Sequence, residues 1–311
     1  MTLDATELRA CFDEPLPERG QPLETILAEL EQRSTGGLAG GTGGRYFGYV
    51  TGGSLPAAAI VEAWTAAVDQ NVGMWPLGPA AVELEQVTLR WLADLVGFPG
   101  ESRYFGSGAT MANTIALAVA RHWFGKRHGV NVLEQGVRAL PELAVRRVPI
   151  DERYRMEVRP LVEAIERDRA AGVEPAIVIA QAGSVKTGAC DPLDEIADVC
   201  AEHVLWLHVD GAFGAFFGLW KPARGLVRGI ERADSLAVDA HKWLNVPNGV
   251  GFVLLRDADL HRETFAGSAG YLTPGAGENL HELGIEASRS WRGACVWAAL
   301  KQLGREGVGD S

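Results

Sequence analysis

Four short apolar runs in the second half of the chain restrict its fold more than any other feature. They are AIVIA (176–180), VLWLHV (204–209), SLAV (235–238) and GFVLL (251–255). The first two are separated by a segment with helical character, Pro192 to His203. Short continuous apolar runs that alternate with helices are typical of a largely parallel sheet with helices on both faces. We therefore expect an α/β fold.

Polar side chains follow three of these runs. Ser184 comes shortly after the first, Asp210 directly after the second, and Asp239, His241 and Lys242 after the third. Ligands of open parallel sheets bind at the carboxyl ends of the strands. Taken singly, each residue has a plainer interpretation, since an aspartate at a strand end is more often a turn or helix cap. Taken together, they predict a hydroxyl, a carboxylate and an ammonium group in one crevice.

A turn of small residues, FGSGAT (105–110), leads into a segment with helical character, Met111 to Phe124. Such a turn exposes unpaired backbone N–H groups at the positive end of the helix, which suits an anion such as phosphate. Thr110 could cap the helix and also donate its hydroxyl. The alternative is an ordinary helix cap with glycines for close packing.

Residues 79–96 have a clear helical periodicity, and Gly97 is placed to end the helix. The apolar positions on one face are Leu84, Val87, Trp91 and Leu95. We expect this face to be buried.

The first part of the chain differs from the rest. Residues 1–35 are polar with apolar positions at helical spacing, and the glycine-rich stretch 36–44 is interpreted as a flexible connector. This stretch lacks the ending of a P-loop, and no strand precedes it as in a Rossmann fingerprint. We divide the chain into an N-terminal helical segment with its connector, 1–44, and a large domain, 45–311.

Composition excludes several classes of partner. The chain has 29 basic and 40 acidic residues and a net charge of −11, which disfavours nucleic acid and anionic membranes. The four cysteines are scattered and form no C-x-x-C pair, and the N-terminus does not have the pattern of a signal peptide. We expect a cytoplasmic protein without a membrane span.

A helix end that suits phosphate, a strand-end aspartate and a lysine beside His-Trp are the parts needed to hold pyridoxal 5'-phosphate. Lys242 would form a Schiff base with the aldehyde of this cofactor. Asp210 would pair with the pyridine nitrogen and keep it protonated, so that the ring can accept electrons.

Two segments, HVDGAFG (208–214) and DAHKWL (239–244), resemble the signatures of group II pyridoxal-dependent amino-acid decarboxylases. These enzymes include the aromatic-amino-acid, glutamate and cysteine-sulfinate decarboxylases, and the resemblance runs from about residue 45 to residue 304. It implies the fold-type I large domain of pyridoxal-phosphate enzymes and a homodimer with its site at the subunit interface. It also implies decarboxylation of an L-amino acid to the amine and carbon dioxide, through an aldimine of Lys242 and a quinonoid intermediate.

The resemblance also implies roles for individual residues. Lys242 matches the aldimine lysine, Asp210 the partner of the pyridine nitrogen, and Tyr271 the loop tyrosine that returns a proton. The other matching positions are phosphate contacts (Ala109, Thr110), a cofactor-contacting hydroxyl (Ser184), a small residue beneath the ring (Ala212), polar neighbours of the lysine (Asp239, His241) and the substrate pocket (Tyr49, Thr51).

The sequence departs from the family at three places. A histidine that stacks on the cofactor ring has no match, because the interval that should hold it is only 125–144 and its one histidine, His128, lies close behind the helix. The chain ends at Ser311, so we expect the smaller C-terminal domain to be absent. Lys186 stands where the family tends to have asparagine. An open alternative is therefore a degenerate homologue that binds the cofactor weakly or not at all. It would be catalytically weak or inactive and would act as a cofactor-binding or dimerisation remnant.

Two other enzyme classes are possible alternatives. A metal hydrolase could use His208, Asp210 and His241 as ligands, but it leaves the phosphate site and Lys242 unexplained. A nicotinamide dehydrogenase fits the fold class but lacks the glycine fingerprint. The substrate stays open, since Tyr49 and Tyr271 are compatible with an aromatic amino acid and no arginine is clearly placed for a second carboxylate.

Overall fold

The computed structural model describes residues 3–46, 48–135, 145–266 and 277–310. The chain divides into two compact units, Met1–Gly48 and Tyr49–Ser311. The first unit contains α1 (Ala5–Phe12), which Asp4 starts with a capping box, and α2 (Leu23–Ser34). Neither helix has a buried residue. The use of this unit in dimerisation, and the boundary after residue 44, stay predictions.

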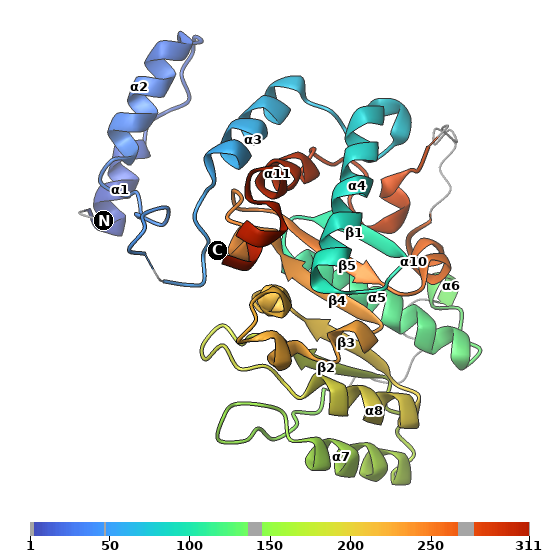
Figure 1. The fold of residues 1–311 in the computed structure, drawn as a ribbon. Helices are drawn as coiled ribbons and strands as arrows, with labels where there is room; N and C mark the ends of the chain where they lie inside the picture. Colours follow the sequence, from blue (N-terminus) through green and yellow to red (C-terminus); the bar gives the residue numbers. More distant parts are fainter. Residues whose placement is uncertain (1–2, 47, 136–144, 267–276, 311) are drawn as a thin grey trace. The chain divides into compact units, whose positions relative to one another are not determined.

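The second unit is organised by a five-stranded sheet in the order β1-β5-β4-β3-β2 (Figure 1). The strands are β1 (Ser102–Gly106), β2 (Ile177–Gln181), β3 (Trp206–Asp210), β4 (Ser235–Asp239) and β5 (Gly251–Leu255). Strands β2, β3 and β4 are parallel, and β5 is antiparallel to both β4 and β1. Strand β1 therefore points the same way as β2, β3 and β4. Four of the five strands share one direction, which confirms the largely parallel sheet.

Helices cover both faces of this sheet, as expected (Figure 1). On one face the core includes residues of α4 (Pro79–Val96), α8 (Leu193–His203) and α11 (Gly293–Asp310), and on the other residues of α5 (Ala109–Arg127). Strand β5 supplies both cores by alternation, with Phe252 and Leu254 on the first face and Val253 and Leu255 on the second. The remaining α-helices are α3 (Pro56–Val68), α6 (Val132–Gln135), α7 (Val158–Ala170), α9 (Ala240–Trp243) and α10 (Ala258–Phe265).

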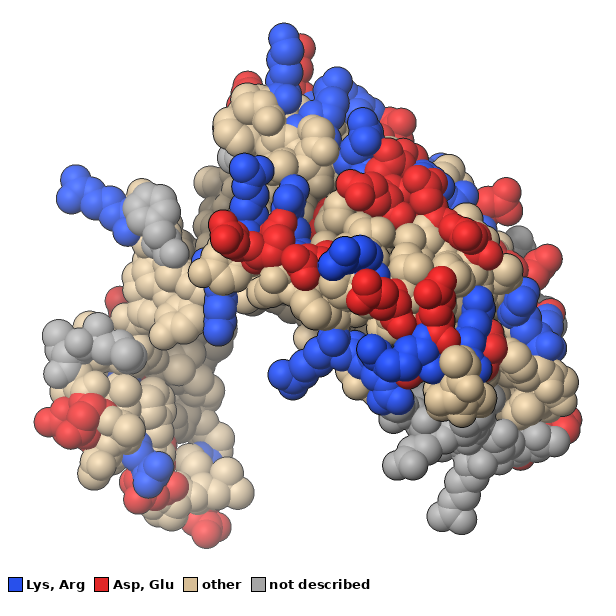
Figure 2. Space-filling model, turned by 90° about the horizontal axis from the view of Figure 1, so that it is seen from below, with Lys and Arg blue, Asp and Glu red and all other residues tan. Residues whose placement is uncertain are grey.

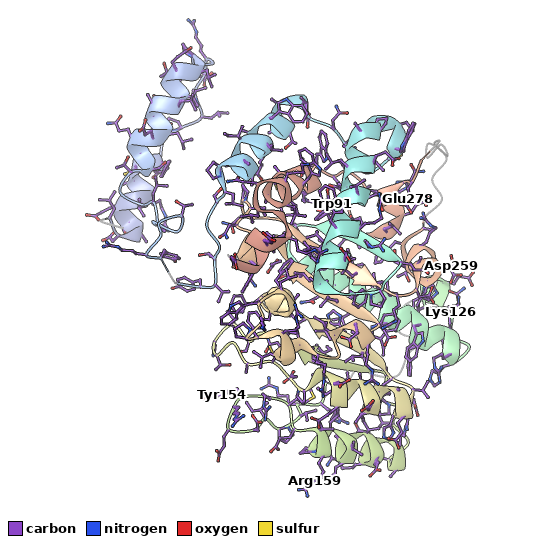
Figure 3. All side chains as sticks on the ribbon, in the orientation of Figure 1. Trp91, Lys126, Tyr154, Arg159, Asp259 and Glu278 are labelled. Atoms are coloured by element: carbon purple, nitrogen blue, oxygen red, sulfur yellow. The ribbon has the colours of Figure 1, made fainter. Side chains whose placement is uncertain are left out.

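Helix α4 has the expected bounds and ends at Gly97, whose φ of +70° is the left-handed conformation of a C-cap. The expected buried face was wrong in part. Leu84 and Val87 are half-buried and Trp91, labelled in Figure 3, is 38% exposed, whereas Glu85 and Leu89 are fully buried. The reason is that α4 packs against β1 and also against α11, so its buried surface is turned from the stripe of largest apolar side chains.

Glu85 is buried because it forms an ion pair with Arg289. The Arg289 Nη2 atom donates to Glu85 Oε2 (2.9 Å) and to the carbonyl of Phe105 (2.8 Å), and the N–H of Gly293 donates to Glu85 Oε1 (3.0 Å). Both side chains are completely buried. The pair thus ties α4 to β1 and to the start of α11.

The surface of the second unit is mixed in charge. On the side of α7 and α8, acidic and basic side chains are interspersed (Figure 2). Ion pairs such as Arg232 with Asp194 (2.8 Å) and with Asp198 (2.7 Å) join them. Within the described ranges, no helix is long and apolar enough to cross a membrane.

Helix α10 packs on the C-terminal half of α5, where Figure 3 shows Asp259 beside Lys126. His261 of this helix is fully buried. Its Nε2–H donates to the carbonyl of Leu283 (2.8 Å), and its Nδ1 accepts from the hydroxyl of Ser102 (2.7 Å). Burial lowers the pKa of His261 to about 4, so the neutral ring is the native form at pH 7.

The folded protein is expected to lose stability as the pH falls from about 6.5 towards 4. The unfolded chain takes up a proton at His261 near the ordinary pKa of 6.5, and the folded chain does so only near 4, so acid favours unfolding. The difference between these pKa values corresponds to roughly 3 kcal/mol below both of them. Urea unfolding at several pH values should show a shallower acid slope for His261→Gln. Ser102→Ala should lower stability but keep the wild-type slope, and an unchanged slope in His261→Gln would contradict the assignment.

Candidate functional site

The carboxyl ends of the parallel strands lie at one edge of the sheet. Gln181 at the end of β2 is in register with Asp210 at the end of β3, and Asp210 is in register with Ala237 in β4. Strand β4 ends at Asp239, which is the N-cap of the short helix α9 that carries Lys242. The fold therefore brings Asp210 and Lys242 to the same edge.

Asp239 joins Lys242 to the start of α5. Its Oδ2 lies 2.8 Å from Lys242 Nζ, and its Oδ1 accepts from the N–H of Ala109 at 2.6 Å. Asp239 is itself buried, so both contacts are shielded from water. His241 lies beside them, with Nδ1–H donating to the carbonyl of Val250 (2.9 Å). The lysine and the helix end, far apart in sequence, are thus held together by one carboxylate.

The N-terminus of α5 is open at this point. The N-cap is Gly108, with φ +148° and no side-chain cap, so the expectation that Thr110 caps the helix was wrong. Thr110 instead lies in the first turn and is exposed. Its N–H and that of Met111 have no acceptor among the described residues. Asp239 takes the N–H of Ala109, and the next two N–H groups of the helix start, those of Thr110 and Met111, suit an anion.

The first residue of β5 lies in close backbone contact with the start of α5. A Cβ atom on Gly251, the first residue of β5, would lie 2.5 Å from the carbonyl carbon of Gly108. Such a distance is far inside van der Waals contact, so this strand needs a glycine where it meets the helix start.

Asp210 carries one hydrogen bond on each carboxylate oxygen. The N–H of Ala212 donates to Oδ1 (3.1 Å), and the side-chain amide of Asn113, on α5, donates to Oδ2 (3.0 Å). A carboxylate has about four acceptor sites, so Asp210 can accept further donors. Because Asp210 is only half-buried, those sites are accessible from the edge of the sheet.

His208, two residues before Asp210 in β3, was considered only as a metal ligand in the sequence. Its ring is fully buried, with Nε2 2.9 Å from Asn113 Oδ1 and Nδ1 2.8 Å from Ser235 Oγ. Burial lowers the pKa of His208 to about 4. Both ring nitrogens are therefore engaged, and the described residues contain no group of three or more metal-ligating side chains. This geometry argues against the metal hydrolase.

The other expected site residues lie in different surroundings. Ser184 is half-buried in the loop after β2, and Lys186 of the same loop is exposed. The loop is closed by the bond from the N–H of Ser184 to the carbonyl of Ala189 (2.8 Å). His128 packs on Phe124, with ring centroids 4.2 Å apart, at the end of α5 that is opposite the site. It is therefore not placed to stack on a ligand at the start of that helix.

The segment expected to line a substrate pocket approaches the residues after Lys242. The N–H of Gly53 donates to Asn245 Oδ1 (2.6 Å), and a Cβ atom on Gly52 would lie 2.3 Å from the carbonyl oxygen of Lys242. Tyr49, three residues before Gly52, is 88% exposed, and Thr51 is also exposed. Tyr271 lies outside the described residues.

A family model described as the pyridoxal-dependent decarboxylase conserved domain matches residues 6–129 and 134–310. The chain belongs to the pyridoxal-dependent decarboxylase family. The model's match is interrupted inside the interval 125–144, where we expected a loss relative to the family. The nicotinamide dehydrogenase is thereby set aside.

Two curated members of this decarboxylase family illustrate the likeness. The chain is 33% identical over 326 residues to the aromatic-L-amino-acid decarboxylase of Bacillus atrophaeus, covering 97% of this chain and 67% of that protein. It is 32% identical to the cysteine sulfinic acid decarboxylase of Rattus norvegicus, covering 86% of this chain and 58% of that protein. The first alignment is longer than the 311 residues of the chain, so that relative contains residues without a counterpart here.

Solved structures of decarboxylases have the same fold. The crystal structure of mouse CSAD superposes with a TM-score of 0.89 at 28% identity, over 99% of this chain and 69% of that one. The Oryza sativa TDC structure with PLP and tryptamine gives a TM-score of 0.90 at 21% identity, which shows the fold alone. The expected fold-type I architecture is confirmed.

The described residues fit the cofactor of this family. Pyridoxal phosphate presents an aldehyde, a basic ring nitrogen and a phosphate. The site offers an amine at Lys242, a carboxylate with free acceptor sites at Asp210, and the unpaired N–H groups of Thr110 and Met111. These three kinds of group lie along one edge of the sheet and on the helix that starts beside it, and Asp239 ties the amine to that helix.

Proposed function

We propose that the chain binds pyridoxal 5'-phosphate at the edge formed by β3, β4 and the start of α5, and decarboxylates an L-amino acid to the amine and carbon dioxide. The observation that carries this proposal is the double contact of Asp239, at 2.8 Å to Lys242 Nζ and 2.6 Å to the N–H of Ala109. It places a reactive amine next to an anion-binding helix end. Membership of the decarboxylase family supports the same reaction.

The cofactor, when bound, supplies an aldehyde for an amine and a ring that withdraws electrons from the bond to be broken. The residues of the chain hold and orient it. Lys242 offers the amine at which the aldehyde attaches, and Asp239 fixes the position of that amine. The start of α5 donates N–H groups to the phosphate, and Asp210 accepts from the protonated ring nitrogen. Ser184 and Ala212 remain proposed cofactor contacts.

Protons at the reacting carbon are proposed to come from Tyr271, and the substrate is proposed to meet Tyr49 and Thr51. Three of the four cysteines are unsuited to nucleophilic roles, since burial raises the pKa of Cys190 to about 11 and those of Cys200 and Cys295 to about 12. Their free thiols agree with the cytoplasmic location that we propose, which cell fractionation tests.

We propose a homodimer because helices of both units expose apolar side chains. Helix α3 exposes Ile60 (70%), Trp64 (54%) and Val68 (37%) along one side, and α2 exposes Leu23, Ile26, Leu27 and Leu30. Exposed apolar helix faces of this kind are typical of protein interfaces. Sedimentation of the purified chain tests the association.

Release of carbon dioxide from a panel of amino acids tests the proposed reaction. With pyridoxal phosphate added, the purified chain is expected to release carbon dioxide from at least one of tyrosine, tryptophan, glutamate and aspartate. The active substrate would also identify the substrate class. Release from none of them by a chain that has bound the cofactor would favour the degenerate homologue. That alternative is motivated by the lack of a match for the ring-stacking histidine. The one histidine of that interval, His128, lies at the end of α5 opposite the site.

A further inference from the structure

A series of buried and half-buried hydrogen bonds leads to Asp210. Trp206 Nε1 donates to Ser235 Oγ (2.9 Å), which lies 2.8 Å from His208 Nδ1. His208 Nε2 lies 2.9 Å from Asn113 Oδ1, and Asn113 Nδ2 donates to Asp210 Oδ2 (3.0 Å). These hydrogen bonds connect β3 and β4 to Asn113 of α5, and they end at Asp210, the last residue of β3. The reaction proposed above assigns no role to the other four residues, which are Trp206, Ser235, His208 and Asn113.

One arrangement of protons satisfies every bond in this series. Asp210 only accepts as a carboxylate, so Asn113 must turn its NH₂ group towards it and its carbonyl oxygen towards His208. His208 must then carry its proton on Nε2. Since the low pKa of His208 leaves the ring neutral, Nδ1 accepts from the hydroxyl of Ser235. Every donor therefore points towards Asp210, and bonds aligned in this way strengthen one another.

We infer that Asn113 is a positioning residue for Asp210, held in its working orientation by His208 and Ser235. The inference rests on the proposed function, in which Asp210 meets the ring nitrogen of pyridoxal phosphate. Asn113 fixes one oxygen of the carboxylate and the N–H of Ala212 fixes the other. The plane of the carboxylate is thereby set before the cofactor arrives, which lowers the entropy lost on binding.

The surroundings explain why His208 and Ser235 are needed for this. Asn113 is on the first turns of α5, the same helix whose start is proposed to hold the phosphate. If its amide turned over, an N–H group would face the Nε2–H of His208 and an oxygen would face Asp210, and both contacts would be repulsive. His208 and Ser235 are register partners in β3 and β4, and both are fully buried, so neither can move aside.

The affinity for pyridoxal phosphate, measured by titration of its visible absorbance, tests the inference. Asn113→Leu keeps the branched shape of the side chain, at a larger volume, and removes the donor to Asp210. It is expected to weaken cofactor binding by about tenfold to a hundredfold, the usual effect of losing one hydrogen bond to a charged group. Thr114→Val is the matched control, because its exposed hydroxyl donates to the carbonyl of Thr110 on the same helix without touching Asp210.

A double-mutant cycle separates positioning from a structural effect. In the background Asp210→Ala, Asn113→Leu is expected to leave the cofactor affinity unchanged, because the carboxylate that it positions is gone. An equal loss of affinity in both backgrounds would overturn the inference, as would wild-type affinity in Asn113→Leu alone. If the wild-type chain bound no cofactor at all, the proposed function would fail and the inference with it.

Discussion

Replacing Lys242 by alanine is expected to abolish the visible absorbance that develops when the purified chain is mixed with pyridoxal phosphate. The absorbance depends on a bond between the cofactor and an amine, and Lys242 is the amine that Asp239 holds at 2.8 Å beside the start of α5. Decarboxylation should fall with it by at least about 10²- to 10⁴-fold, because the amine at which the cofactor attaches is lost. Absorbance spectra and carbon dioxide release measure the two effects.

Lys186 provides the matched control for that variant. It follows β2 at the same end of the sheet, but its side chain is exposed. Lys186→Ala is therefore expected to keep both the absorbance and the activity. Absorbance that survives in Lys242→Ala and disappears in Lys186→Ala would show that the wrong lysine has been assigned.

Removing Arg289 should have the largest effect on stability. Arg289→Ala is expected to lower the free energy of unfolding by about 3–5 kcal/mol, because it leaves the Glu85 carboxylate buried without its cation. Losses of this size are a large part of the roughly 5–15 kcal/mol that stabilises a typical domain. The midpoint of urea unfolding provides the measurement.

The control for Arg289 is another arginine that pairs with a carboxylate of α4. Arg305 of α11 pairs with Asp94 of α4, but these side chains are 58% and 74% exposed. Arg305→Ala should change the stability by no more than about 1 kcal/mol. Equal stability of Arg289→Ala and Arg305→Ala would contradict the expected importance of the buried pair. A double replacement by apolar residues, Glu85→Leu with Arg289→Met, should recover much of the loss, since no unpaired charge remains.

The sequence predicted the parts of the fold whose signal is local. Four apolar runs located β2 to β5, and the polar residues after them indicated which edge carries the chemistry. Strand β1 was missed because Ser102 and Arg103 interrupt its apolar pattern and the following glycines suggested only a turn. The periodicity of α4 gave its length but not its buried face, because that face is set by packing on both β1 and α11.

The interactions that position the site depend on residues that are distant in sequence. Asn113 and His208 are 95 residues apart, and Glu85 and Arg289 are 204 apart, so no local pattern indicates either pair. A sequence signal for the first did exist. His208 interrupts an otherwise apolar strand, and a buried histidine needs hydrogen-bond partners on neighbouring elements. The partners themselves became visible only with the register of β3 against β4 and the placement of α5.

Lys242 is the residue at which we propose that the chain holds pyridoxal phosphate. The most direct measurement is borohydride reduction of the mixed protein and cofactor, followed by mass spectrometry of its peptides. We expect one added cofactor on the peptide that contains Lys242, and no stoichiometric addition elsewhere. A cofactor found on another lysine such as Lys186, or on none, would contradict it.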